Sequence, residues 1–136
     1  MNVTEIPFVK KAGITRTDDN TLGLTFTEDN YNHLQTIHAG AQYTLAETAS
    51  GELLQSAFPD LVGKVIPVLR EANVKYKQPA VKDIIAYATI TDEAREKFST
   101  QFTNKGRGSI LVNVDIKDAD GTLTCVAGYS WFVQKL

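Results

Sequence analysis

Residues 32–47 read NHLQTIHAGAQYTLAE and lead into the longest helix-forming segment of the chain. From about Ala39 to Ala57 the residues are small or favour helix. Phe58-Pro59-Asp60 ends this run, because a proline disfavours helix in the residue before it. The pattern predicts one long helix of about five turns.

The other apolar segments alternate, or are rich in Val, Ile, Thr and aromatic residues, which is typical of strands. They cover residues 22–26, 64–76, 84–91, 109–117 and 122–133. Residues 118–121, Asp-Ala-Asp-Gly, predict a hairpin turn between the last two. Residues 6–9 are interpreted as a short helical segment or a turn, and the charged residues 92–105 as a short helix or a flexible crossover. This order predicts an α+β fold with the helix packed on one face of an antiparallel sheet.

Composition limits the kind of protein. A chain of 136 residues, 43% of them apolar, fits one globular domain over residues 1–136. A net charge of −2 without a basic cluster argues against nucleic acid and anionic membranes as partners. No apolar run approaches the roughly 20 residues that cross a bilayer. A single cysteine, Cys125, excludes an internal disulfide and favours a cytoplasmic setting.

Nucleophiles and metal ligands of other classes are poorly supported. The chain has no G-x-S-x-G motif, and Cys125 lies within a predicted strand, where a small buried hydrophobe is expected. His33, interpreted as a surface loop residue, and His38 lack further ligands at a recurring metal-binding spacing. We therefore expect neither a metal nor a cofactor.

Glu47 interrupts an apolar face of the predicted helix, between Tyr43 and Leu54. A carboxylate there loses hydration, so it has to be paired, protonated, or placed in a pocket that water and substrate enter. No local cation is evident. The alternative is that Glu47 is solvated at a mobile edge. Glu52, its nearest competitor, borders the polar side and is interpreted as an ordinary rim charge.

The start of the helix, at His38 and Ala39, has unpaired backbone N–H groups that favour negative charge. Such a site suits the oxyanion of acyl transfer, where one positioned donor lowers the barrier by roughly 3 kcal/mol. Glu47 is seven residues beyond Gly40, however, or about 10.5 Å along the helix axis. If both groups serve one carbonyl, Glu47 has to come from a second copy. The sequence therefore predicts at least a homodimer.

Three short motifs follow one another at this place: Asn32, then His38-Ala39-Gly40, then Leu45-Ala46-Glu47. They resemble the Asn, His-Gly-Gly and Leu-Ala-Asp/Glu motifs of the hotdog-fold acyl-CoA thioesterases. The most similar branch contains the phenylacetic-acid-pathway thioesterases and the YiiD-like proteins with a DUF4442-like domain. Residues 73–80, with Tyr-x-x-Pro-Ala, and Lys105-Gly106-Arg107-Gly108 are similar to further segments of this branch. The resemblance spans nearly the whole chain and implies a single hotdog domain, with five to six strands wrapped around the central helix.

The resemblance implies roles for the matching residues. Glu47 would act as general base or as carboxylate nucleophile, and the N–H of Ala39 would bind the thioester oxygen. Asn32 would orient water or the carboxylate, and Gly40 belongs to the same catalytic loop. Ala39 departs from the family's glycine: the N–H survives, but a methyl group is added near the carbonyl. His38 would either hydrogen-bond near the carbonyl or fix the loop.

Further residues are candidates for substrate contacts. Lys105, Gly106, Arg107 and Gly108 would hold the phosphates of coenzyme A, or else form a plain solvated turn. Lys75 and Lys77 share one strand face and are secondary candidates. Tyr43, Leu54 and Phe58 would line an acyl site, or belong to the core or a dimer contact.

The resemblance implies hydrolysis of an acyl-CoA or related thioester by a homodimer or a dimer of dimers, with coenzyme A present only as part of the substrate. One alternative is a noncatalytic acyl-CoA-binding module of the same fold. Another is a hotdog dehydratase or hydratase, which the spacing of His38 and Glu47 supports less well. The acyl group, the choice between CoA and a carrier protein, and the choice between dimer and tetramer stay open.

Overall fold

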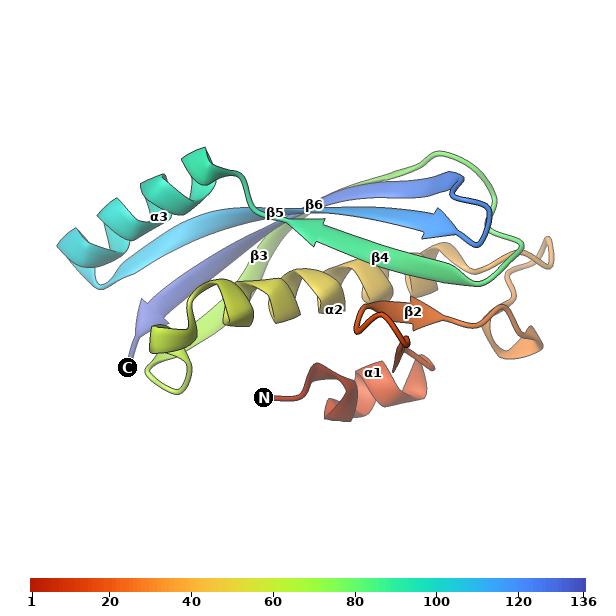
Figure 1. Cartoon of the computed structure of the whole chain (residues 1–136), viewed down its shortest axis with the longest axis horizontal. Coiled ribbons are helices and arrows are strands. Elements are labelled where there is room, and N and C mark those ends of the chain that lie inside the picture. Colours follow the sequence, from red (N-terminus) through yellow and green to blue (C-terminus); the bar gives the residue numbers. More distant parts are fainter.

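A computed structural model describes all 136 residues of the chain. Six strands form one antiparallel sheet in the order β1-β2-β4-β5-β6-β3, and the long helix α2 lies along one face of it (Figure 1). The strands are β1 (Thr15–Arg16), β2 (Leu22–Leu24), β3 (Val65–Tyr76), β4 (Ile84–Thr89), β5 (Arg107–Asp118) and β6 (Leu123–Lys135). The helices are α1 (Pro7–Lys11), α2 (Ala39–Ala57) and α3 (Asp92–Lys105), with short 3-10 turns η1 (Val3–Glu5), η2 (Glu28–Asn30) and η3 (Pro59–Leu61).

Both ends of α2 are set by local sequence and lie where they were predicted. His38 is the N-cap, and its ring Nδ1 accepts the N–H of Gly40 at 2.8 Å. Phe58 leaves the helical region, with φ −130° and ψ 65°, immediately before Pro59. Neither α2 nor any other helix has the length and apolar content required to cross a membrane.

The main hydrophobic core lies between α2 and the sheet. Leu45, Ala46 and Ala49 of α2 belong to one cluster with Val114 and Ile116 of β5. Alternate residues of β5 are buried, so one face of this strand meets the helices and the other face is exposed. The prediction of a helix packed on an antiparallel sheet is confirmed.

Residues 92–105, which the sequence left open between a helix and a crossover, form α3. The hydroxyl of Thr91 caps the helix by accepting the N–H of Ala94 at 3.0 Å. Phe98 is the one buried residue of α3, and its ring centroid lies 5.1 Å from that of Phe58 at the end of α2. One buried aromatic residue in a charged helix gives a weak periodic signal, which is why the pattern alone did not decide the segment.

Some element boundaries differ from the prediction. β1 was not predicted, because it has two residues and both are exposed. β2 ends at Leu24 instead of residue 26, and β4 ends at Thr89 instead of residue 91. The hairpin turn is confirmed: Asp118 Oδ1 accepts the N–H groups of Asp120 and Thr122, at 2.9 and 3.0 Å.

β3 forms one edge of the sheet and pairs only with β6. The other side of this strand therefore has unpaired backbone N–H and C=O groups along most of its 12 residues. Three of its apolar side chains are about half exposed, namely Ile66 (53%), Val68 (47%) and Tyr76 (47%). A long edge strand with exposed apolar residues is a template for pairing with another chain.

Candidate active site

Glu47 lies near the middle of α2, on a stripe of the helix directed away from the main core. Gly40, Thr44, Glu47 and Gly51 share this stripe, because their spacing of four, three and four residues matches the helical repeat. Glu47 is partly buried. Its carboxylate belongs to none of the three ion pairs of the chain and accepts no hydrogen bond within it.

Two contacts with β6 hold the turns of α2 around Glu47. The hydroxyl of Tyr129 donates to the carbonyl of Tyr43 at 2.8 Å, and the two rings meet edge to face. Nε1–H of Trp131 donates to Ser50 Oγ at 2.9 Å, and the Ser50 hydroxyl donates to the carbonyl of Glu47 at 2.7 Å. Sequence reasoning missed Tyr129 and Trp131. Their alternate spacing on the inward face of a predicted strand is the signal that points to them.

Burial raises the pKa of the Glu47 carboxyl above its ordinary value of 4.5, because water solvates the carboxylate poorly here and no cation offsets the loss. This partial burial is at odds with a fully solvated Glu47. A carboxylate with a raised pKa is a stronger base at the moment of proton transfer. The environment of Glu47 therefore suits general-base chemistry.

The raised pKa also predicts that Glu47 lowers the stability of the fold. At a pH above the pKa of Glu47 in both the folded and the unfolded state, the folded state buries a charge that water solvates better in the unfolded chain. At a pH below both pKa values, Glu47 is protonated in both states and this cost to stability disappears. We expect Glu47→Gln to raise the free energy of unfolding at pH 7, by about 1.4 kcal/mol for each unit of pKa elevation. The gain should fade as the pH falls toward 4.5.

Urea unfolding of the wild type and of Glu47→Gln across a pH series measures this effect. Glu52→Gln is the matched control, because Glu52 lies on the same helix but pairs with Arg16, at 3.0 Å between Arg16 Nη1 and Glu52 Oε1. Removing that partner should lower the stability by about 0.5–1 kcal/mol at pH 7. A Glu47→Gln protein that is less stable than the wild type at pH 7 would contradict the burial argument.

The start of α2 has one N–H group without an acceptor in the chain. Of its first four N–H groups, that of Gly40 is bound by His38 Nδ1, and those of Ala41 and Gln42 reach the His38 carbonyl at 2.9 and 3.2 Å. The N–H of Ala39 has no such partner. His38 therefore fixes the loop, as one of its two interpretations expected, and the N–H of Gly40 is already used.

Tyr76, at the end of β3, holds the first turn of α2 in place. Its hydroxyl donates to the carbonyl of Ala39 at 3.0 Å. The contact joins the exposed edge strand to the start of α2. It uses the carbonyl of Ala39, so the N–H of the same residue still has no acceptor within the chain. Apart from the Tyr-x-x-Pro-Ala segment, no sequence pattern indicates this contact.

Asn32 organises the loop before α2. Its Oδ1 accepts the N–H groups of Leu34 and Thr36, at 2.9 and 3.0 Å, and its Nδ2 donates to Thr36 Oγ1 at 2.8 Å. No contact within the chain joins Asn32 to Glu47. His33, in the same loop, is exposed, in agreement with its interpretation as a surface residue.

The structure does not bring Glu47 and the Ala39 N–H together within one chain. The helix between them is continuous, so Gly40 and Glu47 are separated by about 10.5 Å along the axis. A single carbonyl cannot be reached by both groups of the same copy. The two groups have to be assigned to different copies if they share one substrate.

An apolar cavity of about 550 Å³ lies at the C-terminal end of the stripe that carries Glu47. Of its 15 lining residues, 11 are hydrophobic. Leu54 and Phe58 line it, whereas Tyr43 packs against Tyr129 instead. The N-terminal residues also form a wall of this cavity, a feature with no signal in the sequence.

A second cavity, of about 560 Å³, lies at the N-terminal end of the same stripe. It is lined mainly by polar residues, among them Lys10 and Lys11 of α1, His38 and Thr44. Sequence reasoning did not single out the two lysines, because they are far from the start of α2 in the sequence and lie near it only in the folded chain. Glu47 thus lies between a polar and an apolar cavity.

The other candidate contacts for coenzyme A lie elsewhere. Lys105 and Arg107 flank Gly106, whose φ of 68° ends α3, and Gly108 is buried against Gln101 and Phe98. This segment is a tight connection between α3 and β5. Lys75 and Lys77 alternate with Tyr76, which reaches α2, and so point to the opposite face of the sheet.

Cys125 and Glu52 behave as the sequence suggested. Cys125 is fully buried, and burial raises the pKa of its thiol to about 11, so it is protonated at neutral pH. Glu52 forms a two-pronged ion pair with Arg16 at the side of α2. Neither residue lies on the stripe of α2 between the two cavities, so Glu47 stays the candidate catalytic residue.

Comparisons with known proteins identify a matching family model and solved structures with a similar fold. The model of the family described as "Domain of unknown function (DUF4442)" matches residues 7–133, and a search of curated protein sequences finds no match. A probable thioesterase from Pseudomonas aeruginosa has a TM-score of 0.83 at 22% identity, covering 98% of this chain and 91% of that chain. A Bacillus halodurans protein solved with CoA has a TM-score of 0.68 at 25% identity, covering 88% and 70%. A Haemophilus influenzae thioesterase has a TM-score of 0.76 at 18% identity, covering 98% and 87%. The shared fold is the hotdog fold.

Proposed function

We propose, from the fact that this chain belongs to the DUF4442 family, that it hydrolyses acyl-CoA thioesters. The family and the fold are those that the resemblance of the sequence motifs implied. Of the similar structures, one is named a probable thioesterase and another a thioesterase, and the Bacillus halodurans protein was solved with CoA. These names support a thioester substrate for this chain.

The observation that carries the proposal is a partly buried carboxylate without a partner, Glu47, on a helix whose first N–H, that of Ala39, also lacks one. Glu47 would take a proton from water as the water oxygen attacks the thioester carbon. The Ala39 N–H would bind the carbonyl oxygen as it gains negative charge. Collapse of the adduct breaks the C–S bond, and the proton passes from Glu47 to the leaving thiolate.

Glu47 would act equally well as a nucleophile. Its carboxylate would then attack the carbonyl carbon and expel the thiolate, and water would hydrolyse the resulting anhydride. The products of the two routes are the same carboxylic acid and thiol. Asn32 and His38 are positioning residues in both, since they shape the loop that presents the Ala39 N–H.

The active unit would be a homodimer in which each site combines Glu47 of one copy with Ala39 of the other. Three observations support it: the distance between these groups along α2, the unpaired edge of β3, and the exposed Ile66 and Val68 on that edge. Antiparallel pairing of two β3 strands would set the two α2 helices in opposite directions. A dimer of dimers would keep the same sites.

Coenzyme A is part of the substrate in this proposal, and no further cofactor is required. Lys105 and Arg107 are our candidates for its phosphates, with Lys75 and Lys77 as secondary candidates. The first two lie at the α3–β5 connection and the other two on the outer face of β3. Whether these side chains reach the phosphates of a coenzyme A bound at Glu47 therefore depends on how the two copies pair. Single Lys→Ala changes would raise KM and leave kcat unchanged.

Thiol release from a series of acyl-CoAs, combined with sedimentation of the same preparation, tests the proposal. We expect turnover with stoichiometric thiol and acid, by a protein that sediments as a dimer or larger. A fully active monomer would contradict the shared site. Tight binding of acyl-CoA without thiol release would instead favour a noncatalytic binding module, and hydration of an enoyl-CoA without thiol release would favour a hydratase.

A further inference from the structure

We propose that the apolar cavity beside α2 takes the aliphatic acyl chain of the substrate, and that the N-terminal segment, Met1–Ile6, is one of the walls that limit the chain length. The inference rests on the proposed function, which it deepens by naming the class of acyl group. An unbranched chain running from Glu47 toward Phe58 is the ligand that the volume and the apolar lining of this cavity favour.

The cavity begins directly beyond the candidate catalytic residue. Gly51 lies four residues after Glu47, about 6 Å along the helix on the same stripe, and lines the cavity. A side chain at Gly51 would meet the ring of Trp131 at 3.3 Å, so glycine lets that ring lie against the helix. Gly51 and the Trp131 ring against it therefore form the part of the cavity lining next to Glu47, and Leu54 and Phe58 continue that lining along α2.

The lining selects an apolar ligand. Val65 and Val133 close the cavity on the sheet side, Phe98 on the α3 side, and the loop that includes Val62 at the far end. No charged side chain lines it. A cavity of about 550 Å³ falls within the range of sites that hold organic ligands. A short acyl group would leave most of it unfilled, whereas a long chain would exclude water from it.

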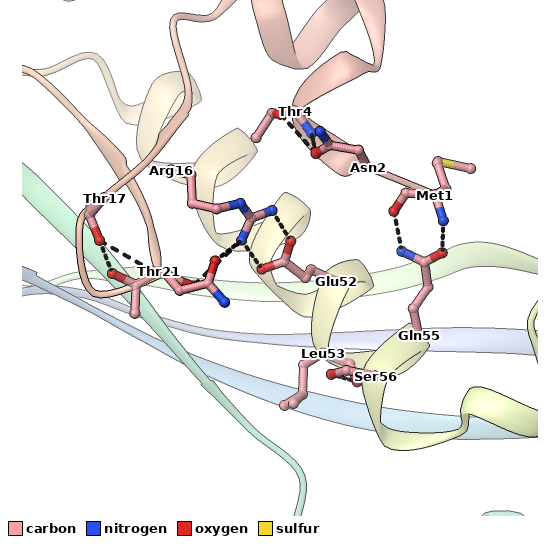
Figure 2. A network of polar contacts seen from close by, with 11 residues as sticks. Met1, Asn2, Thr4, Arg16, Thr17, Thr21, Glu52, Leu53, Gln55 and Ser56 are labelled. Carbon is pink, nitrogen blue, oxygen red and sulfur yellow. Dashed lines mark hydrogen bonds and ion pairs between the residues drawn. The ribbon is translucent and has the colours of Figure 1, made fainter.

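The N-terminal segment supplies the remaining wall. Met1, Val3 and Ile6 line the cavity, and Val3 is only 5% exposed. Figure 2 shows how the segment is tied to α2: Gln55 Nε2 donates to the carbonyl of Met1, and the Met1 amino group donates to Gln55 Oε1, both at 3.1 Å. The wall is therefore anchored to the helix that carries Glu47.

Ile6 is the residue through which this wall is best altered. It is 36% exposed, so a larger side chain there enters the cavity without displacing the main core. We expect Ile6→Trp to shift the preferred substrate to shorter acyl chains and Ile6→Ala to shift it to longer ones. Val62→Trp, at the far end, should shorten the preferred chain independently, since Val62 is 49% exposed.

The experiment measures kcat/KM for acyl-CoAs from acetyl to palmitoyl. In the wild type, kcat/KM should rise about fourfold per added methylene until the cavity is full. Ile6→Trp should remove this gain for long chains. Leu111→Trp is the matched control, because Leu111 is an aliphatic residue, 44% exposed, on the face of β5 directed away from the helices.

Binding of nonhydrolysable acyl-CoA thioethers separates the two proposals. Chain-length selection in binding that changes in Ile6→Trp and not in Leu111→Trp would support this cavity even if no acyl-CoA were hydrolysed. The same chain-length profile in the wild type, Ile6→Trp, Val62→Trp and Ile6→Ala would overturn the inference, even if hydrolysis were observed. Loss of acetyl-CoA turnover in Ile6→Trp together with unchanged chain-length selection would also overturn it.

Discussion

Glu47→Gln is expected to lower kcat for thioester hydrolysis by about 10²–10⁴-fold. The amide keeps the size of the side chain but neither accepts a proton nor attacks a carbonyl. Because the uncharged side chain also removes the cost of burying a carboxylate, this inactive protein should be at least as stable as the wild type. Thiol release and urea unfolding of one preparation measure both effects.

The pH dependence of the wild type provides a second readout of Glu47. Only the carboxylate accepts a proton, so kcat should rise with pH and level off above the pKa of Glu47. Burial raises that pKa, and the inflection should therefore lie above 4.5. The residual activity of Glu47→Gln should lack this inflection, and Glu52→Gln should retain both the activity and the inflection. Wild-type turnover in Glu47→Gln would exclude Glu47 from the reaction.

Ala39→Pro is expected to lower kcat by about 10²–10³-fold while leaving the fold intact. Proline is favoured at the first position of a helix, where it removes only the N–H group. His38 already has φ −58° and ψ 137°, the extended conformation that a residue before proline prefers. Ala39→Gly, which keeps the N–H, is the matched control and should retain activity. Thiol release together with circular dichroism measures the result.

Mixing the two inactive proteins tests whether the site is shared between copies. In a mixed dimer of Glu47→Gln and Ala39→Pro, one of the two sites combines an intact Glu47 with an intact Ala39 N–H. Such a dimer should regain about half of the wild-type turnover, whereas each parent dimer stays inactive. Co-expression with two different affinity tags yields the mixed dimer. If purified mixed dimers regain no turnover, Glu47 and the Ala39 N–H either act in a site within one chain or do not act in the same site.

Much of the fold was predictable because it depends on neighbours in the sequence. The ends of α2 follow from His38 and Pro59, and the β5–β6 hairpin follows from Asp118 and Gly121. The candidate site was predictable to the same extent: a carboxylate on an apolar face and the first N–H of a helix are local properties. The partial burial of Glu47 agrees with the desolvation that its helical face predicted.

The rest required the tertiary structure, because it depends on residues that are distant in the chain. Phe98 stabilises α3 through Phe58, which lies forty residues earlier in the sequence. Trp131 and Tyr129 position the turns around Glu47 from the last strand, and Met1 and Ile6 complete a cavity against α2. Periodicity and capping signals have a range of a few residues, so they define elements. Which side chains meet across those elements is decided only when the sheet closes on the helix.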